Sequence, residues 1–275
     1  MKNQAEIDNW NGAIGERWAT FQEALDARIR VYGEQVLKAA GLGAGMRVLD
    51  VGAGCGEMTL EAARTVGDAG RVVGVDISRP MLGRARERAS ASALSNVELV
   101  EHDASIYTTD APFDAILSRF GVMFFDDPAG AFANIRAAIK PGGRLTFVCW
   151  QSLAANPWAA VPLSAVVGVL PAPPSAAPNA PGPFAFADPV RVRELLSGAG
   201  WSDVVLTPFT NAMTLGSTLE EALEYSGRMG PAARLLRDAD DATRARALDA
   251  LRDTLSPLAP GFTLGGAVWV VTAKG

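Results

Sequence analysis

Short β-rich runs alternate with helical segments through the first half of this 275-residue chain. A chain that alternates in this way can cover both faces of its strands only by forming a mostly parallel sheet with helices on each side. The pattern therefore predicts one α/β domain with insertions. The strands are expected at RVLDV (47–51), RVVGV (71–75), VELVE (97–101), DAILS (114–118) and RLTFVCW (144–150).

An amphipathic helix is predicted ahead of the first strand. Apolar residues recur there at steps of three and four, which is the spacing of one helix face. We therefore expect a helix that packs this face inward. The residues are Ile14, Trp18, Phe21, Leu25, Ile29, Tyr32 and Val36.

The character of the chain changes after residue 150. The segment 171–183, PAPPSAAPNAPGP, holds six prolines among thirteen residues, which excludes a helix or a central strand. Whether it is a surface linker or a moving lid stays open. Further on we expect a helix over 189–199, strands at 203–209 and 267–273, and an insertion of helices over 218–257 that caps the sheet.

Charge and composition exclude several classes of partner. A net charge of −5 and a pI near 5.1 provide no basic surface for nucleic acid. The start of the chain is polar and acidic, unlike a secretory signal, and the apolar stretch 158–170 is too short to span a bilayer. We expect a cytoplasmic enzyme without a membrane partner.

Cysteine and histidine are scarce in this sequence. Cys55, Cys149 and His102 are the whole set, too few for a disulfide framework or a Cys/His metal cluster, so no metal is expected. A hydrolytic triad would need His102 itself as its base. The chemistry is therefore expected to work without a metal and without a covalent nucleophile.

A glycine-rich loop follows the first predicted strand. In parallel sheets, ligands bind at the carboxyl ends of the strands, and the segment 52–56, GAGCG, lets a ligand approach backbone N–H groups at a helix N-terminus. Asp76 follows the second strand, where a carboxylate can accept hydrogen bonds from ribose hydroxyls. Asp103 follows the third strand, where it could accept a bond from an adenine amino group. The three signals predict a nucleotide-like cofactor.

The residues from 45 to 150 resemble the class I S-adenosylmethionine-dependent methyltransferases, in particular the ubiquinone/menaquinone-biosynthesis-like group that acts on small molecules. The resemblance implies a Rossmann-like, doubly wound, seven-stranded sheet with an antiparallel last strand, and S-adenosyl-L-methionine as cofactor. It also implies the cofactor contacts. These are Asp50, Gly52, Ala53, Gly54 and Gly56 for the amino acid end, Asp76 for the ribose, Ile77 and Met81 for the adenine faces, Asp103 and Ala104 for the adenine edge, and Ser118 and Arg119 beside the methionine moiety.

Candidate catalytic and substrate residues are less sharply marked. Arg119 could contact cofactor or substrate, or form a salt bridge to Asp126 or Asp127. His102 could reach the cleft or be an exposed residue at a strand end. Aromatic residues, as a group, suggest a lid and an apolar substrate cleft. They are Trp10, Trp18, Phe21, Phe120, Phe124, Trp150 and Trp158.

The expected reaction is direct methyl transfer to a small, partly apolar or aromatic metabolite. The main rival is a nicotinamide-dependent oxidoreductase, but its G-x-G-x-x-G fingerprint would need glycine where this chain has Glu57. A protein that keeps the cofactor site for another reaction also stays open, as do the acceptor atom and a homodimeric state. The expected domains are an N-terminal helical lid (1–44), the cofactor-binding core (45–150), a proline-rich loop or lid (151–188), and the end of the sheet with the cap insertion (189–275).

Overall fold

The computed structural model describes residues 3–171 and 180–275. The chain divides into two compact units. The first holds the residues up to Trp150 together with Ala180–Pro208 and Val268–Gly275. The second holds the described residues from Gln151 to 171 and the segment Phe209–Ala267. Both units are built from segments that are discontinuous in the sequence.

A seven-stranded sheet with the order β3-β2-β1-β4-β5-β7-β6 forms the framework of the chain. The five predicted strands are parallel neighbours, and β5 pairs with β7 in the antiparallel direction, from Arg144 opposite Lys274 to Trp150 opposite Val268. The predicted fold class is confirmed. The strands are β1 (Arg47–Val51), β2 (Arg71–Asp76), β3 (Val97–Glu101), β4 (Phe113–Arg119), β5 (Ile139–Trp150), β6 (Ser202–Thr214) and β7 (Thr263–Lys274).

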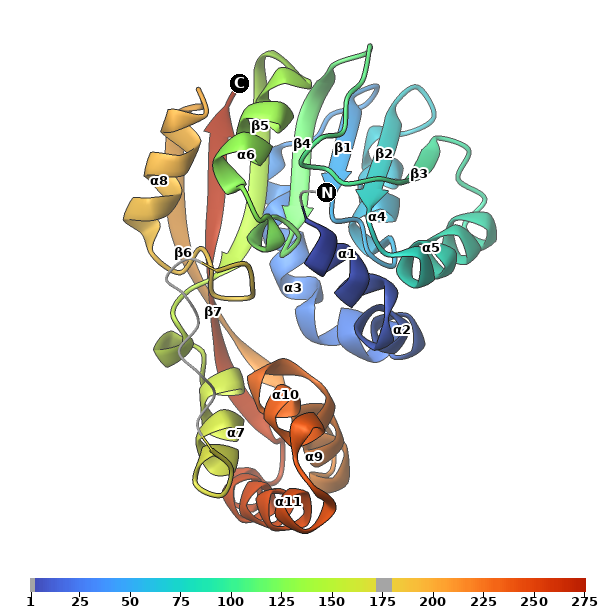
Figure 1. The fold of residues 1–275 in the computed structure, drawn as a ribbon. Helices are drawn as coiled ribbons and strands as arrows, with labels where there is room; N and C mark the ends of the chain where they lie inside the picture. Colours follow the sequence, from blue (N-terminus) through green and yellow to red (C-terminus); the bar gives the residue numbers. More distant parts are fainter. Residues whose placement is uncertain (1–2, 172–179) are drawn as a thin grey trace. The chain divides into compact units, whose positions relative to one another are not determined.

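Helices cover both faces of the sheet in the first unit. In Figure 1, α6 (Pro128–Ala137) and α8 (Pro189–Gly198) lie on one face, and α3 (Gln22–Ala40) and α4 (Glu57–Val66) lie on the other. Helix α5 (Arg79–Ala91) contacts the outer strand β3. The interior of the first unit is built mainly from apolar side chains that are shielded from solvent. Examples that are at most 2% exposed are Leu49, Phe113, Ile116, Phe132 and Phe147. Burial on this scale is the main favourable contribution to folding.

The N-terminal helix differs from the prediction. The single helix expected over Ile14–Val36 is broken at Phe21, whose backbone leaves the helical region (φ −98°, ψ 20°). The break separates α2 (Ala13–Thr20), which contacts α5, from α3, which contacts β4 and β5. One straight helix could not serve both surfaces. A further short helix, α1 (Gln4–Asn11), precedes them.

The second unit is a group of helices on the ends of β6 and β7 (Figure 1). Its helices are α7 (Pro157–Val167), α9 (Leu219–Arg228), α10 (Gly230–Asp238) and α11 (Asp241–Leu255). Side chains from α7, α10 and α11, with Leu170 just after α7, form a common apolar core of Val166, Leu170, Ala232, Leu236 and Ala247. The helices expected within 218–257 are therefore present. Among the described residues, no helix combines the length and apolar character that crossing a bilayer requires.

Two expectations for this part of the chain need correction. The segment 151–188, expected as a loop, contains α7, because the apolar side chains of Trp158, Ala159 and Val166 are buried along that helix. Strands β6 and β7 are longer than predicted, because their extra residues belong to the second unit. Whether the proline-rich segment is a linker or a moving lid stays a prediction, because most of that segment, residues 172–179, lies outside the described residues.

Candidate functional site

The glycine loop after β1 has a backbone that only glycine adopts readily. Gly52, Gly54 and Gly56 have φ values of 73°, 54° and 84°, in the left-handed region where a Cβ is strained. A Cβ on Gly52 would also lie 2.8 Å from the Cα of Gly121, in the turn after β4. The loop is thus pressed against a second strand end, and its amide groups precede the N-terminus of α4.

Asp76, the last residue of β2, ties this loop to its own strand end. Its Oδ2 accepts a hydrogen bond of 2.7 Å from the Gly54 amide, and its Oδ1 accepts one of 2.8 Å from the Ser78 amide. Burial raises the pKa of Asp76, although these bonds favour the charged form. Each carboxylate oxygen can accept a second bond. Asp76 could therefore receive two hydroxyl groups of one ligand.

Asp50 lies beneath the loop and is only 1% exposed. Its Oδ2 accepts a bond of 2.6 Å from the Thr59 hydroxyl, while its Oδ1 has no hydrogen-bond partner among the described residues. Burial raises the pKa of Asp50 to about 6. A buried acceptor without a partner is costly, and its place below the glycine loop fits a group that serves a ligand.

Asp103 follows β3 and is nearly buried, as is its neighbour Ala104. The Asp103 Oδ1 accepts a bond of 2.8 Å from the Ser105 amide. His102, by contrast, is exposed, and its ring packs edge-on against Tyr107. The structure therefore agrees with the alternative for His102, a residue exposed at a strand end.

The remaining predicted contacts also lie near the loop. The Met81 methyl group lies 3.0 Å from where a Cβ on Gly54 would be, so Met81 covers the loop. The buried Ser118 hydroxyl donates a bond of 2.7 Å to the carbonyl of Val51, at the end of β1. The fold thus brings the ends of β1, β2 and β4 together around one glycine loop.

Arg119 has other partners than the two acids considered from the sequence. Its guanidinium pairs with Glu57 at the start of α4 and, at 2.8 Å, with Asp26 of α3, and not with Asp126 or Asp127. Its side chain is 11% exposed, and the two carboxylates are at most 8% exposed. Buried charges require such pairing.

Arg88 of α5 extends this ion-pair network to the glycine loop. Its guanidinium donates to Asp26 at 3.0 Å and to the Cys55 carbonyl at 2.6 Å. Burial acts to raise the pKa of Asp26, but Arg119 together with Gln22 outweighs it, so that this pKa is lowered. The network holds α3 and α5 to the glycine loop. Burial raises the pKa of the Cys55 thiol to about 12, which leaves that thiol uncharged.

Five of the aromatic candidates lie in two clusters. Trp10 packs edge-on against Trp18 and against Phe124, with ring centroids 6.1 and 5.2 Å apart. Phe120 stacks on Trp150 at 4.4 Å with an interplanar angle of 9°. Tyr32 completes the second cluster by packing edge-on against both rings.

Phe120 stands out within the second cluster because its φ is +65°, which is strained for a bulky side chain. Backbone strain of this kind concentrates at functional sites. Phe21 lies at the break between α2 and α3. Trp158 belongs to the second unit, where its indole donates to Asn156.

Comparison with known proteins assigns the central segment. Residues 48–143 match the family described as "Methyltransferase domain". This segment is therefore similar to that family. Together with the strand order, the match confirms the resemblance to the class I S-adenosylmethionine-dependent methyltransferases.

A relative and two solved structures show how far the likeness extends. The ubiquinone/menaquinone biosynthesis C-methyltransferase UbiE of Teredinibacter turnerae is 36% identical over 136 residues, 48% of this chain and 55% of that protein. The chain spans about half the length of the curated relatives it matches. The YcgJ protein of Bacillus subtilis has a TM-score of 0.60 at 18% identity over 89% of this chain and 98% of that one. The [4+2]-cyclase SpnF has a TM-score of 0.53 at 21% identity over 89% and 80%. Both structures share the fold.

Helix α1 makes contacts, not predicted from the sequence, with the segment that matches the methyltransferase-domain family. The side-chain Nδ2 of Asn11 donates a hydrogen bond of 2.7 Å to the Ile77 carbonyl, and its Oδ1 accepts one of 2.9 Å from the Arg79 backbone amide. Ser78 holds the N-cap position of α5, yet its hydroxyl donates a hydrogen bond of 2.7 Å to the Trp10 carbonyl instead of capping the helix. Asn3, at the other end of α1, contacts Asp103. Polar residues in a short helix give no periodic signal, so only the pairing across the fold reveals them.

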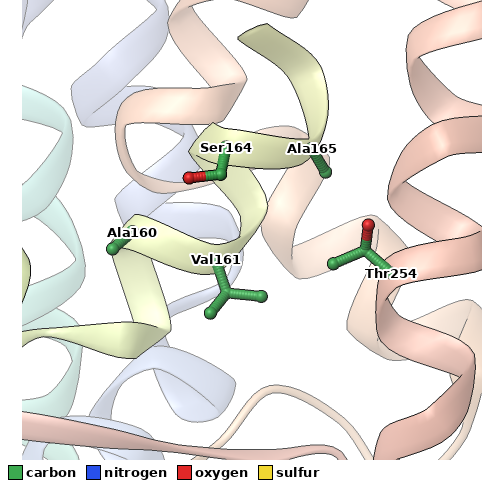
Figure 2. A pocket seen from close by; sticks show the side chains of 5 residues that line it. All are labelled: Ala160, Val161, Ser164, Ala165 and Thr254. Carbon is green, nitrogen blue, oxygen red and sulfur yellow. The ribbon is translucent and has the colours of Figure 1, made fainter. Parts of the chain in front are cut away.

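A cavity of about 380 Å³ lies in the second unit, between α7 and α11. Figure 2 shows its lining, which consists of small and apolar side chains with two hydroxyl groups. The Thr254 hydroxyl donates to the Ala250 carbonyl of its own helix. None of the predicted site residues lies in this cavity, whose lining is Ala160, Val161, Ser164, Ala165 and Thr254.

Proposed function

We propose that this chain transfers a methyl group from S-adenosylmethionine to a small, partly apolar or aromatic metabolite. One observation carries the proposal. Within the segment that matches a methyltransferase domain, the Asp76 carboxylate holds the Gly54 amide at 2.7 Å and keeps acceptor capacity for a ribose. This joins the glycine loop and the acidic strand end into a single site.

The cofactor contacts implied by the resemblance are part of this proposal. The loop, with the unpartnered oxygen of Asp50 beneath it, fits the polar amino acid end, because it offers both amide donors and a buried acceptor. Asp76 receives the ribose. Ile77 and Met81 flank the adenine, Asp103 and Ala104 read its edge, and Ser118 and Arg119 lie beside the methionine moiety.

When bound, the cofactor supplies an electrophilic methyl group on a sulfonium. The protein then needs to align the acceptor behind that methyl group and to exclude water. No covalent nucleophile is required, which agrees with an exposed His102 and an uncharged Cys55 thiol. Arg119 is already held by two carboxylates, so we assign it to holding α3 against the loop rather than to proton transfer.

Two features support a partly apolar acceptor. The rings of Phe120 and Trp150 stack on each other; Phe120 directly follows β4 and Trp150 is the last residue of β5, at the carboxyl ends where ligands of parallel sheets bind. The relative UbiE is named a C-methyltransferase of ubiquinone/menaquinone biosynthesis. We therefore propose an acceptor with a planar or apolar portion.

A second candidate function is a reaction other than methyl transfer at the same cofactor site. The chain shares its fold with the [4+2]-cyclase SpnF, and one fold can carry several reactions. This likeness is the reason for the second candidate. The nicotinamide-dependent alternative is disfavoured by Glu57, which stands where a third fingerprint glycine would be, and by the antiparallel β7.

Thermal unfolding with ligands tests the proposal. S-adenosylmethionine and S-adenosylhomocysteine should each raise the Tm of the full chain, because a ligand that binds the folded state stabilises it, whereas NADH should not. Asp76→Ala should abolish the shift, while Asp68→Ala, at an exposed acid between α4 and β2, should retain it. A shift with NADH alone would refute the assignment. Cofactor binding without methyl transfer to any tested apolar acceptor would favour the second candidate.

A further inference from the structure

Asn3 precedes the short helix α1, and hydrogen bonds to residues far away in the sequence hold its side chain in place. It is 4% exposed and has a left-handed backbone (φ 60°). Its backbone amide donates a hydrogen bond of 2.7 Å to Oδ2 of Asp126. Its side-chain Oδ1 accepts a hydrogen bond of 2.8 Å from the backbone amide of Asp126. This reciprocal pair fixes the position of the Asn3 carboxamide.

The nitrogen of that carboxamide points at the acid after β3. Asn3 Nδ2 lies 3.1 Å from each of the two carboxylate oxygens of Asp103. Oδ1 of Asp103 also accepts the Ser105 amide. A carboxylate oxygen accepts about two hydrogen bonds. Among the described residues, Oδ1 is thus fully used, whereas Oδ2 has room for one more donor.

We propose that Asn3 is a positioning residue for adenine recognition. It fixes the Asp103 carboxylate so that Oδ2 presents its remaining acceptor site to the exocyclic amine of the cofactor. This inference rests on the proposed function and adds to it a residue outside the matched domain. Asp103 already accepts an sp² amino group, that of Asn3, so an adenine amine is a donor of the same kind.

The arrangement links adenine recognition to helix α1. Asn3 precedes α1 and binds the acid after β3, while Asn11, the last residue of α1, binds the segment that follows Asp76. The helix therefore spans the two strand ends assigned to adenine and ribose. Docking of α1 completes the adenine edge of the site.

Binding of two ligands to the full chain tests the role of Asn3. Calorimetry would compare S-adenosylhomocysteine with S-inosylhomocysteine, which carries a carbonyl group in place of the adenine amine. The wild type should prefer the adenine ligand by about tenfold or more, since a hydrogen bond to a charged group is lost and a carbonyl faces a carboxylate. In Asn3→Ala this preference should fall by at least about threefold, because the carboxylate is no longer fixed.

Two outcomes would overturn the proposal. An unchanged preference, with both ligands weakened alike, would make Asn3 only a structural anchor of α1. Tighter binding of S-adenosylhomocysteine by Asn3→Ala would mean that Asn3 competes with adenine for Asp103. If the wild type binds neither ligand, the proposed function itself fails, and this is distinguishable from both outcomes.

Two further variants separate positioning from general damage. Asn11→Ala, at the other end of α1, is the matched control and should weaken both ligands without changing their ratio. Asp126→Ala removes an anchor of Asn3 without altering Asp103, and should lower the preference in the same direction as Asn3→Ala. Circular dichroism of each variant would verify that it is folded. A ratio unchanged in Asp126→Ala and Asn3→Ala alike would contradict the proposal.

Discussion

The buried carboxyl group of Asp50 makes the stability of the first unit depend on pH. Asp50 is 1% exposed, and burial raises its pKa from 3.8 to about 6. Between those two pKa values the folded state binds more protons than the unfolded state, so stability falls as the pH rises through this window. Above the folded pKa the full penalty is present. Neutral Asp50→Asn removes that penalty.

The size of the effect follows from the two pKa values. Ionised Asp50 costs about 3 kcal/mol near pH 7.5 and about 1 kcal/mol near pH 4.5. Asp50→Asn should therefore gain about 2 kcal/mol more at the higher pH than at the lower. Any constant cost of the new amide, such as a buried N–H without a partner, cancels in this difference.

Native-state hydrogen exchange of the β1 amides at both pH values would measure this difference, because β1 reports on the unit that contains Asp50. The exposed Asp68→Asn is the matched control and should show no such pH dependence. An Asp50→Asn effect that is equal at the two pH values would refute the reasoning. It would mean that the pKa of Asp50 is not raised by burial.

Three other substitutions test separate parts of the structure. Gly52→Ala places a Cβ 2.8 Å from the Gly121 Cα at a positive φ, so we expect a loss of about 1–3 kcal/mol in unfolding free energy and loss of S-adenosylhomocysteine binding by calorimetry; full retention of both would contradict the close contact. Arg119→Met removes one partner from each of two buried carboxylates, while Asp26 keeps Arg88 and Glu57 keeps Arg30, and it should cost about 1.5–3 kcal/mol in urea unfolding, whereas a neutral effect would mean that the ion pairs are solvated. Arg244 donates to three carbonyl groups at the end of α10, and Arg244→Ala should increase hydrogen exchange in the last turn of that helix without changing exchange in β1; equal changes in both would show that the effect is not local.

The sheet could be predicted from the sequence because its signals are local. Each parallel strand is a short apolar run, and the glycines of 52–56 meet a backbone requirement that the structure displays directly. The break at Phe21 was not predictable in this way. The apolar spacing continues through it, and only the different partners of α2 and α3 require a change of direction. Helix α7 was not predicted, because Pro162 lies inside it and the proline-rich segment 171–183, which disfavours a helix, follows it.

The partners of charged and polar side chains were the least predictable part of the site. Arg119 pairs with acids 93 and 62 positions away in the chain, while the sequence suggested two nearby acids. The sequence did indicate that Asp26 has a charged partner. Asp26 directly follows Leu25, which lies on the apolar face of the helix, and a carboxylate at the edge of such a face needs a buried partner. For Asn3 there was no such indication, since its role depends entirely on an acid one hundred positions later.

The contact between Gly52 and Gly121 limits how this protein could be redesigned. The two glycines belong to different strand ends, and a side chain on either would strike the backbone of the other. A library meant to change acceptor preference would naturally randomise the turn after β4, where Phe120 lies. Position 121 must be left out of such a library, because a side chain there would displace the glycine loop. Diversity is better placed at position 120, with glycine included so that the positive φ is tolerated.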